Sequence, residues 1–193
     1  MEKVEQITGD DIFSQELDGL VVSGYYDYFE IGSSIINKCD FSKSNLQGVD
    51  ICDSEIKFSN FSNVDLTEHS YKKVIFKGCT MVGVDFAGSF LEEVVFDNCN
   101  LNYANFSGCN FKKVKFNACK LDDASFNEVK WKELVMDNCS MHSTEFLKTS
   151  LKDLDVSNCD VNDLRILNDG LKGLIVSSEQ ALSLSLLLGI KIK

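Results

Sequence analysis

An apolar residue recurs at every fifth position from Ile31 to Val176, thirty times in succession and without a phase slip. An α-helix repeats about every 3.6 residues and a β-strand about every two, so a spacing of five fits neither element. A fixed period over most of a chain is typical of repeat proteins, in which neighbouring units stack and bury a shared core. The sequence therefore predicts a solenoid.

The residues between the apolar positions define how each unit turns. The residue two places before the large apolar one is small or β-branched in most units, as in Val74, Cys79 and Ala104, and an Asp or Asn often lies between them. The two residues that follow are mostly polar or Gly. Each unit thus places two residues inward and three outward, which predicts a corner every five residues and a square coil of twenty.

Residues of one type recur twenty positions apart, as a coil of twenty requires. These recurrences form one column of thiols and two of phenyl rings, and we assign them to the structural core: Cys79, Cys99, Cys119, Cys139 and Cys159; Phe86, Phe106, Phe126 and Phe146; Phe76, Phe96 and Phe116. Cys39 extends the thiol column and Ser59 fills its gap. At about 4.8 Å per coil, 7.5 coils predict a rod about 36 Å long and about 20 Å wide.

These units resemble the pentapeptide-repeat family, whose pattern is A(D/N)LXX. The likeness is unit by unit in residues 100–126, NLNYANFSGCNFKKVKFNACKLDDASF, and extends over residues 31–176. It implies an all-β solenoid, the right-handed quadrilateral β-helix of that family. Four outward positions that usually hold Asp or Asn are apolar here, and we expect local bulges or unusual packing at them: Ile75, Phe90, Val95 and Val135.

The two ends of the chain leave this pattern. Residues 1–30 carry eight acids and one lysine, and we expect them to form an irregular N-terminal cap with a poorly formed first coil. After Val176, Ser177 and Gln180 have the spacing of a capping box, which predicts a helix over 178–188 that ends at Gly189.

The predicted helix has more apolar residues than one contact with the last coil can cover. A two-fold dimer through residues 177–193 would bury the remainder. The tail also resembles that of the Qnr-type quinolone-resistance proteins, in which the tail is the dimer interface. The residues we expect in that interface are Leu182, Leu186, Leu187, Ile190 and Ile192.

No constellation in the sequence points to catalysis, to a metal or to a cofactor. The thiol column lacks metal-ligand spacing, so we assign it to packing, with redox or metal binding as the alternative. Cys52 points outward and is the more reactive thiol on exposure alone. His69 falls inward and is interpreted as a hydrogen-bonded core residue. Asp122 and Asp123 are interpreted as solvated surface, and we expect no enzymatic activity.

The overall charge of −11 argues against direct binding of nucleic acid. The chain has no apolar run long enough to span a membrane and begins with acidic, polar residues, so we expect a cytoplasmic protein. The resemblance to the Qnr-type group implies a rod-shaped homodimer that imitates DNA and binds bacterial DNA gyrase or topoisomerase IV. We expect the acidic partner surface to include Asp122, Asp123, Asp160 and Asp163.

Charge density and the absence of loops limit that interpretation. Residues 32–176 carry a net charge of −5, whereas a DNA duplex of about 36 Å carries about 21 charges, so the imitation of DNA is partial. The unbroken repeat leaves no room for the protruding loops that serve drug protection in Gram-negative members. The alternative is a pentapeptide-repeat scaffold that binds another protein or has no assigned activity, because a fold does not fix a function.

Overall fold

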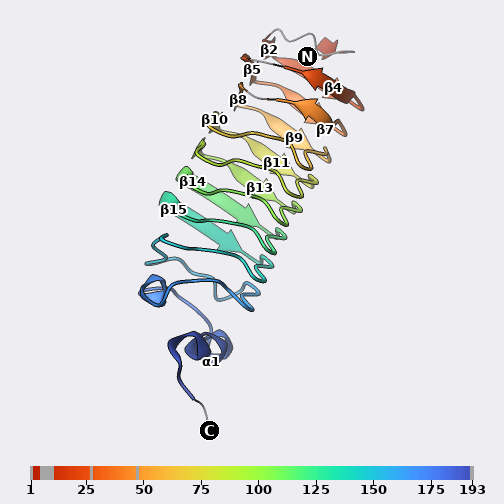
Figure 1. Ribbon diagram of the computed structural model, residues 1–193. Coiled ribbons are helices and arrows are strands. Elements are labelled where there is room, and N and C mark those ends of the chain that lie inside the picture. Colours follow the sequence, from red (N-terminus) through yellow and green to blue (C-terminus); the bar gives the residue numbers. More distant parts are fainter. Residues whose placement is uncertain (1, 5–10, 27, 47, 192–193) are drawn as a thin grey trace.

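The chain winds into a straight rod of stacked coils. Figure 1 shows the computed structural model, in which residues 2–4, 11–26, 28–46 and 48–191 are described. From β5 onward each coil pairs in parallel with the coil twenty residues later, so that Phe76 lies beside Phe96 and Phe96 lies beside Phe116. This fold is the right-handed quadrilateral β-helix, and the predicted coil of twenty is confirmed.

Two adjacent sides of the rod carry most of the strands, which form one 13-stranded sheet. One side consists of β2 (Ile12–Phe13), β5 (Phe29–Gly32), β8 (Val49–Cys52), β10 (Ser70–Lys72) and β12 (Phe90–Glu92). The other consists of β1 (Glu2–Val4), β3 (Gln15–Asp18), β6 (Ile35–Asn37), β9 (Glu55–Lys57), β11 (Ile75–Lys77) and β13 (Val95–Asp97). The longer strands β14 (Asn110–Asn117) and β15 (Lys130–Asp137) run along both sides.

The other two sides consist mainly of turns joined by isolated bridges. A second, two-stranded sheet lies there at the N-terminal end, formed by β4 (Val21–Tyr25) and β7 (Asp40–Asn45). Further along the rod single residues bridge to their equivalents in the next coil, as Asp85 does to Asn105. The Asn105 amide also donates to the Asp85 carboxylate at 3.0 Å. This contact explains why Asp and Asn are frequent at that position.

Most corners of the coil are residues in the left-handed backbone region. Lys73, Glu93, Lys113 and Glu133 form one corner column, with φ values of 52°, 56°, 54° and 60°. This conformation costs a residue other than glycine about 1–2 kcal/mol, so the stacked core and the ladder hydrogen bonds must offset it at most corners. The prediction of a corner every five residues is confirmed.

The interior of the rod is filled by the phenyl and thiol columns. All seven predicted phenyl rings and all five predicted thiols are buried. Rings of one column stack on each other, with centroids 5.3 Å apart for Phe86 and Phe106 and 5.0 Å apart for Phe106 and Phe126. Rings of the two columns meet edge to face, which is the arrangement that aromatic quadrupoles favour.

The solenoid begins earlier than the apolar series indicates. Where we expected an irregular cap, β2 pairs with β5 and β3 with β6, so that Ile12 lies beside Ile31 and Leu17 beside Ile36. Both pairs are nineteen residues apart. The first coil therefore has nineteen residues and not twenty. Its apolar residues are for this reason one position out of phase with the five-residue spacing of the later coils.

The bulges expected at four apolar outward positions are absent from the described strands. Ile75 pairs with Val95 and Phe90 with Asn110, in register with their neighbours. Val135 continues the same ladder beside Lys115. The expectation of bulges was wrong because these positions lie in sheet strands, where the ladder itself satisfies the backbone and no Asp or Asn is needed to close a turn.

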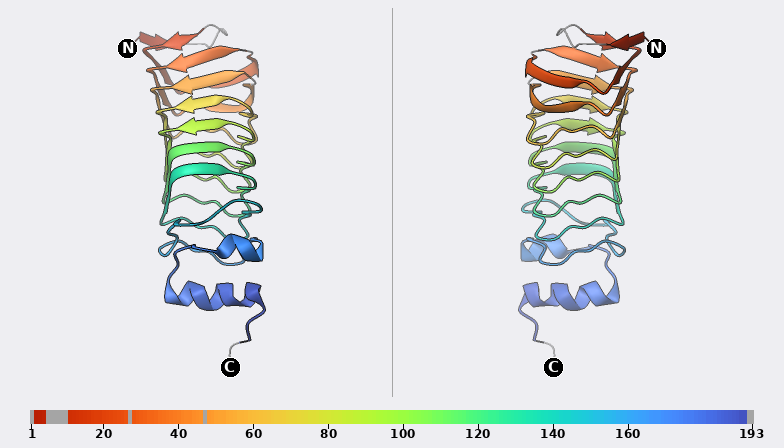
Figure 2. Two further views of the ribbon diagram at one scale, coloured as in Figure 1. Left: turned by 90° about the vertical axis from the view of Figure 1, so that its left-hand side faces the viewer. Right: turned by 90° about the vertical axis from the view of Figure 1, so that its right-hand side faces the viewer.

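The coil path changes before the C-terminus. A short 3-10 helix, η1 (Asn168–Leu171), interrupts the last coil, and α1 (Ser178–Ser185) then lies across the end of the rod (Figure 2). Ser177 and Gln180 form the predicted capping box, and Gly189 ends the segment in a left-handed conformation. The expected helix over 178–188 is thus α-helical up to Ser185 and continues as the 3-10 helix η2 (Leu186–Leu188).

Candidate functional site

The charged residues divide unevenly around the rod. We call the segments 40–49, 60–69, 80–89, 100–109, 120–129, 140–149 and 160–169 the turn side, because most of the isolated bridges lie there. By sequence the turn side has eleven acids and four bases, a net charge of −7. The remaining residues of 32–176, which we call the sheet side, have ten acids and twelve bases, a net charge of +2. The acidity of the solenoid therefore belongs to one half of its circumference.

The structure brings the four predicted surface acids together near one end of the turn side. Asp122 and Asp160 flank His142, which lies in the coil between them. The backbone N–H of His142 donates to Asp122 at 3.0 Å, and its imidazole Nε2 lies 2.6 Å from Asp160 Oδ2. Asp123 lies 4.0 Å from the Arg165 guanidinium, and Asp163 is exposed. Part of the charge of this cluster is therefore balanced locally.

The balancing cations were not predicted from the sequence, although the repeat period locates them. Arg165 and Glu145 are twenty residues apart and form an ion pair at 2.9 Å. Lys148 and Glu128 have the same spacing and pair at 2.7 Å. In a coil of twenty, opposite charges at this separation must lie side by side.

The acidic surroundings of His142 make its titration a test of the cluster. The bond to Asp160 raises the pKa of the His142 imidazole, and the charges of Asp122 and Asp163 act in the same direction. Protonated His142 therefore stabilises the folded protein. This contribution is complete below the pKa of about 6.5 that His142 has in the unfolded chain, and it is lost as the pH rises through the higher pKa of the folded protein. We expect Asp160→Asn to lower the pKa of His142 in an NMR titration, whereas Asp53→Asn, on the sheet side, leaves it unchanged. If the pKa of His142 is unchanged in Asp160→Asn, the contact between His142 and Asp160 is contradicted.

Most of the cysteines are packed in the core. All eight are free, and seven are buried. The Cys99 and Cys119 thiols donate to the carbonyl oxygens of residues 76 and 96, both at 3.3 Å. Burial raises the pKa of the Cys109 thiol to about 12. Among the described residues no group of three or more His, Cys, Asp or Glu could hold a metal ion.

Cys52 is the most accessible thiol, but it is not activated. Partial burial and the bond to the Glu30 carboxylate raise the pKa of the Cys52 thiol to about 11, so its exposure is not accompanied by activation. We expect folded protein at pH 7.5 to release less than one equivalent of thionitrobenzoate from Ellman's reagent within minutes, and denatured protein to release eight. Glu30→Gln is expected to accelerate labelling of Cys52, while Glu55→Gln serves as the control.

His69 is partly buried, and both its ring nitrogens have neighbours. The backbone N–H of Gly48 donates to His69 Nε2 at 2.7 Å, and Nδ1 lies 3.5 Å from an Asp50 carboxylate oxygen. An accepting Nε2 places the proton of the neutral ring on Nδ1. This arrangement agrees with the interpretation of His69 as a hydrogen-bonded structural residue.

The C-terminal segment leaves an apolar face exposed. Gln180 ties α1 to the last coil by donating to the carbonyl oxygens of Val156 at 2.9 Å and Cys159 at 2.6 Å. Leu184 is the one buried residue of α1. Exposed fractions of the predicted interface residues are 57% for Leu182, 65% for Leu186, 40% for Leu187 and 49% for Ile190. Ile192 lies outside the described residues.

A groove of about 190 Å³ separates α1 from the last coil and adjoins this face. Its lining is almost wholly apolar: Leu171, Leu174, Val176, Ala181, Leu184, Ser185 and Leu188. One side of the helix is thus only partly packed against the solenoid, and another side meets solvent. In the described parts of the chain, no helix is long and apolar enough to cross a membrane.

Comparison with known families agrees with this architecture. A family model described as "Pentapeptide repeat region" matches residues 55–126 and 109–174, and one described as "Pentapeptide repeats (8 copies)" matches residues 35–68. The chain belongs to the pentapeptide-repeat family. No curated protein sequence matches it significantly.

Solved structures of the same fold resemble the chain at low sequence identity. Full-length QnrB1, a plasmid-mediated fluoroquinolone resistance protein, is 19% identical with a TM-score of 0.41, over 93% of this chain and 100% of QnrB1. HetL, a pentapeptide repeat protein involved in heterocyst differentiation regulation in the cyanobacterium Nostoc, is 14% identical with a TM-score of 0.37, over 90% of this chain and 93% of HetL. These likenesses concern the fold alone.

Proposed function

We propose that the protein is a non-enzymatic interaction protein whose acidic turn side occupies the DNA-binding surface of a type II topoisomerase, DNA gyrase or topoisomerase IV. The observation that carries this proposal is the segregation of charge, −7 on the turn side against +2 on the sheet side. A DNA-binding surface is basic, so it attracts an acidic surface and repels a basic one. The likeness to the Qnr group directs the choice of partner.

The rod has a shape that suits this role. Its sides of about five residues give a width of about 20 Å, which is near that of a DNA duplex. The net charge of the turn side remains well below that of duplex DNA of the same length. Binding therefore depends on shape and on a limited number of charges, and drug protection does not follow from it.

The proposed active form is a homodimer joined through the C-terminal segments. An apolar surface is formed by the exposed leucines of α1 and η2 and by the adjoining groove. Exposure of such a surface to water is unfavourable. A two-fold contact would bury this surface in both copies and double the length of the acidic rod.

The proposal is tested by supercoiling assays with purified gyrase. We expect micromolar protein to inhibit supercoiling and to retain gyrase subunits in a pull-down. Neutralising Asp122, Asp123 and Asp163 with asparagine is expected to weaken inhibition at least about tenfold, because a protein–protein surface loses its steering charges. Neutralising Asp53, Glu93 and Asp153 on the sheet side removes the same charge and is expected to change inhibition little.

Two outcomes would contradict topoisomerase binding. One is the absence of both inhibition and retention with the unaltered protein, and the other is equal loss in the two triple variants. The first outcome would favour the second candidate function, a scaffold for another protein, which the low charge density also favours. Capture of a different protein by the unaltered chain, lost in the turn-side variant, would support the scaffold.

A further inference from the structure

We propose that Cys139 and Cys159 form a two-coordinate site for one soft monovalent cation, copper(I). The two residues are neighbours in the thiol column, and both thiols are free. The inference does not depend on topoisomerase binding, because the site lies in the interior of the rod and not on the turn side. Three observations carry it, namely the spacing of the sulfur atoms, the end of the thiol column at Cys159 and a groove beside that end.

The sulfur atoms of the thiol column repeat with the rise of the coil. From Cys79 to Cys159 each thiol donates to the carbonyl oxygen twenty-three residues earlier, at distances between 3.3 Å and 3.6 Å. Because every coil makes the same contact, neighbouring sulfur atoms lie about one coil apart, or about 4.8 Å. The thiolate bond of zinc, the element next to copper, is about 2.3 Å long, so two such bonds in line span about 4.6 Å. A metal ion can therefore bridge two neighbouring sulfur atoms with little movement of the coils.

The ligands of this pair select a soft ion of low coordination number. Thiolate sulfur prefers soft cations such as copper(I), which accepts two thiolates in line. In the described part of the chain no group of three or more His, Cys, Asp or Glu is placed to hold a metal ion, and this disfavours zinc, which takes four ligands. Binding forms two copper–sulfur bonds and breaks two S–H bonds. Both protons pass to the solvent, and neither copper nor sulfur is oxidised.

The pair at the C-terminal end of the thiol column is favoured over the pairs inside it. The bound dithiolate carries one negative charge, which is costly to bury away from water. The next position of the column is Glu179 in α1, so no further thiol follows Cys159. Cys159 is 7% exposed, against 2% for Cys139. On the other side of Cys139, the neighbouring Cys119 thiol can donate its S–H to the Cys139 thiolate.

A groove of about 200 Å³ between the last coil and α1 adjoins this end of the column. Cys159 belongs to its lining, together with two acids, Asp160 and Glu179. The two carboxylates attract cations into the groove. Since the groove lies beyond the last coil, an ion reaches Cys159 without passing through the stack.

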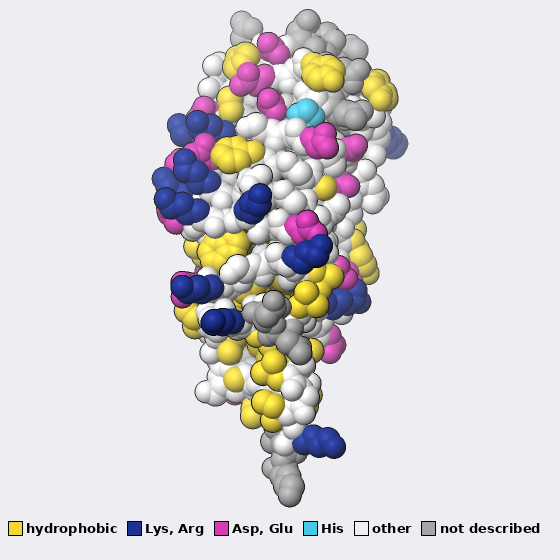
Figure 3. All heavy atoms as spheres, turned by 60° about the vertical axis from the view of Figure 1, so that its left-hand side comes forward, with side chains coloured by type: hydrophobic (Ala, Val, Ile, Leu, Met, Phe, Trp, Pro, Cys, Tyr) yellow, Lys and Arg dark blue, Asp and Glu magenta, His cyan; other side chains and the backbone are white. Residues whose placement is uncertain are grey.

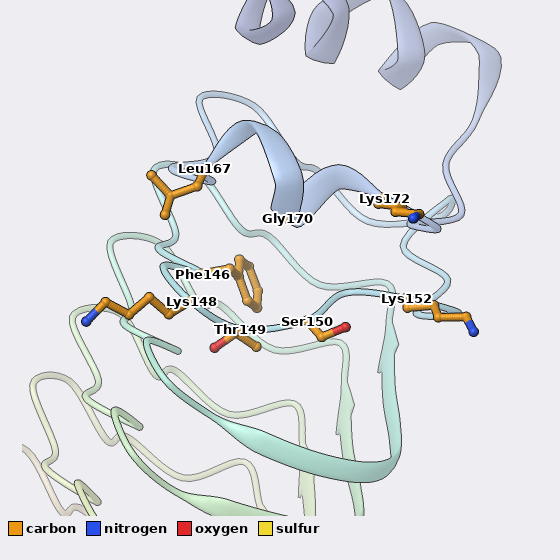
Figure 4. Close-up of a pocket in the computed structure, with 8 residues that line it drawn as sticks. All are labelled: Phe146, Lys148, Thr149, Ser150, Lys152, Leu167, Gly170 and Lys172. Atoms are coloured by element: carbon orange, nitrogen blue, oxygen red, sulfur yellow. The ribbon is translucent and has the colours of Figure 1, made fainter.

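The C-terminal end of the rod is also less closely packed than its middle. Figure 3 shows hydrophobic side chains gathered at the surface of this end. Figure 4 shows a second opening, a cavity of about 450 Å³ beside the last coils, with Phe146, Thr149 and Leu167 in its lining. Local opening costs least where packing is incomplete, so the last coil can part from its neighbour to admit an ion between Cys139 and Cys159.

The test measures copper(I) binding in the absence of air, by competition with a chromophoric copper(I) chelator and by native mass spectrometry. We expect one ion per chain and the ultraviolet absorption of copper(I)–thiolate bonds. Cys139→Ser and Cys159→Ser are each expected to weaken binding at least about a hundredfold, because loss of an outer partner of a metal ligand already costs about 10–100-fold. Cys109→Ser removes an equally buried thiol outside the column and is expected to keep the affinity within about twofold.

Serine is a suitable replacement because the chain already has it in the same register. Ser59 fills one place there, and its hydroxyl donates to the Lys57 carbonyl oxygen at 2.8 Å. Circular dichroism and the unfolding midpoint of each metal-free variant confirm its fold. Copper(I) is expected to raise the unfolding midpoint of the unaltered protein, because the ion binds the folded chain.

Each contrary result would overturn the site. Such results are the absence of bound copper(I), unchanged affinity in Cys139→Ser or Cys159→Ser, and equal weakening in Cys109→Ser. A lower unfolding midpoint in the presence of copper(I) would show that the ion binds thiols of the unfolded chain instead. Zinc that binds as tightly as copper(I) would contradict the two-coordinate geometry.

Discussion

Replacing Phe106 with alanine is expected to lower the free energy of unfolding by about 3–5 kcal/mol, measured by denaturant titration. Phe106 lies in the middle of the stack and is fully buried. Its ring stacks on Phe86 and Phe126 and meets Phe96 and Phe116 edge to face, with centroids 5.9 Å and 5.5 Å away. Truncation removes apolar surface from every one of these contacts and leaves a cavity that rigid coils cannot close.

The loss of stability in Phe106→Ala is confined to the coils that contact Phe106. Each coil contacts only its neighbours, so a defect in one coil weakens two interfaces and no others. Phe90→Ala is the matched control, because the Phe90 ring is 40% exposed on a strand of the sheet side. It is expected to cost below about 1 kcal/mol. A cost below 1 kcal/mol for Phe106→Ala as well would show that the phenyl columns do not hold the coils together.

The inward columns could be predicted because their period is a property of the sequence alone. Tyr71 and Phe76 follow the five-residue spacing, and the structure buries both. The first coil escaped prediction because the same spacing is present at Ile12, Leu17 and Val22 but falls one residue out of phase with Ile31. A test for a single deletion in the period would have found it.

The candidate surfaces were predictable to different degrees. The capping box of Ser177 and the exposed leucines follow from short-range spacing, so local sequence was sufficient. The segregation of acids to the turn side was also present in the sequence, but it appears only when residues are assigned to sides of the coil. The path of the last coil was not predictable, because Ile166 and Leu171 keep the apolar period while the backbone forms η1 over Asn168–Leu171.

Replacing Leu186 with glutamate is expected to convert a homodimer to a monomer without unfolding the solenoid. Leu186 is 65% exposed in the single chain, so the change costs the monomer little. In the proposed dimer the same side chain would be buried against the second copy, and an unpaired charge in such an interface costs several kcal/mol. Light scattering at micromolar concentration is expected to give the mass of two chains for the unaltered protein, about 43 kDa, and of one chain, 21.6 kDa, for Leu186→Glu.

The control introduces the same charge at an equally apolar but distant site. Val135 is 46% exposed on the sheet side and lies beside Lys115, which can pair with a glutamate there. Val135→Glu is therefore expected to keep the mass of two chains. Circular dichroism and the unfolding midpoint separate loss of the dimer from loss of the fold, since the thirty stacked units do not include Leu186. If Leu186→Glu keeps the mass of the unaltered protein, the C-terminal leucines are not the interface, and the apolar face of α1 and η2 must serve another contact.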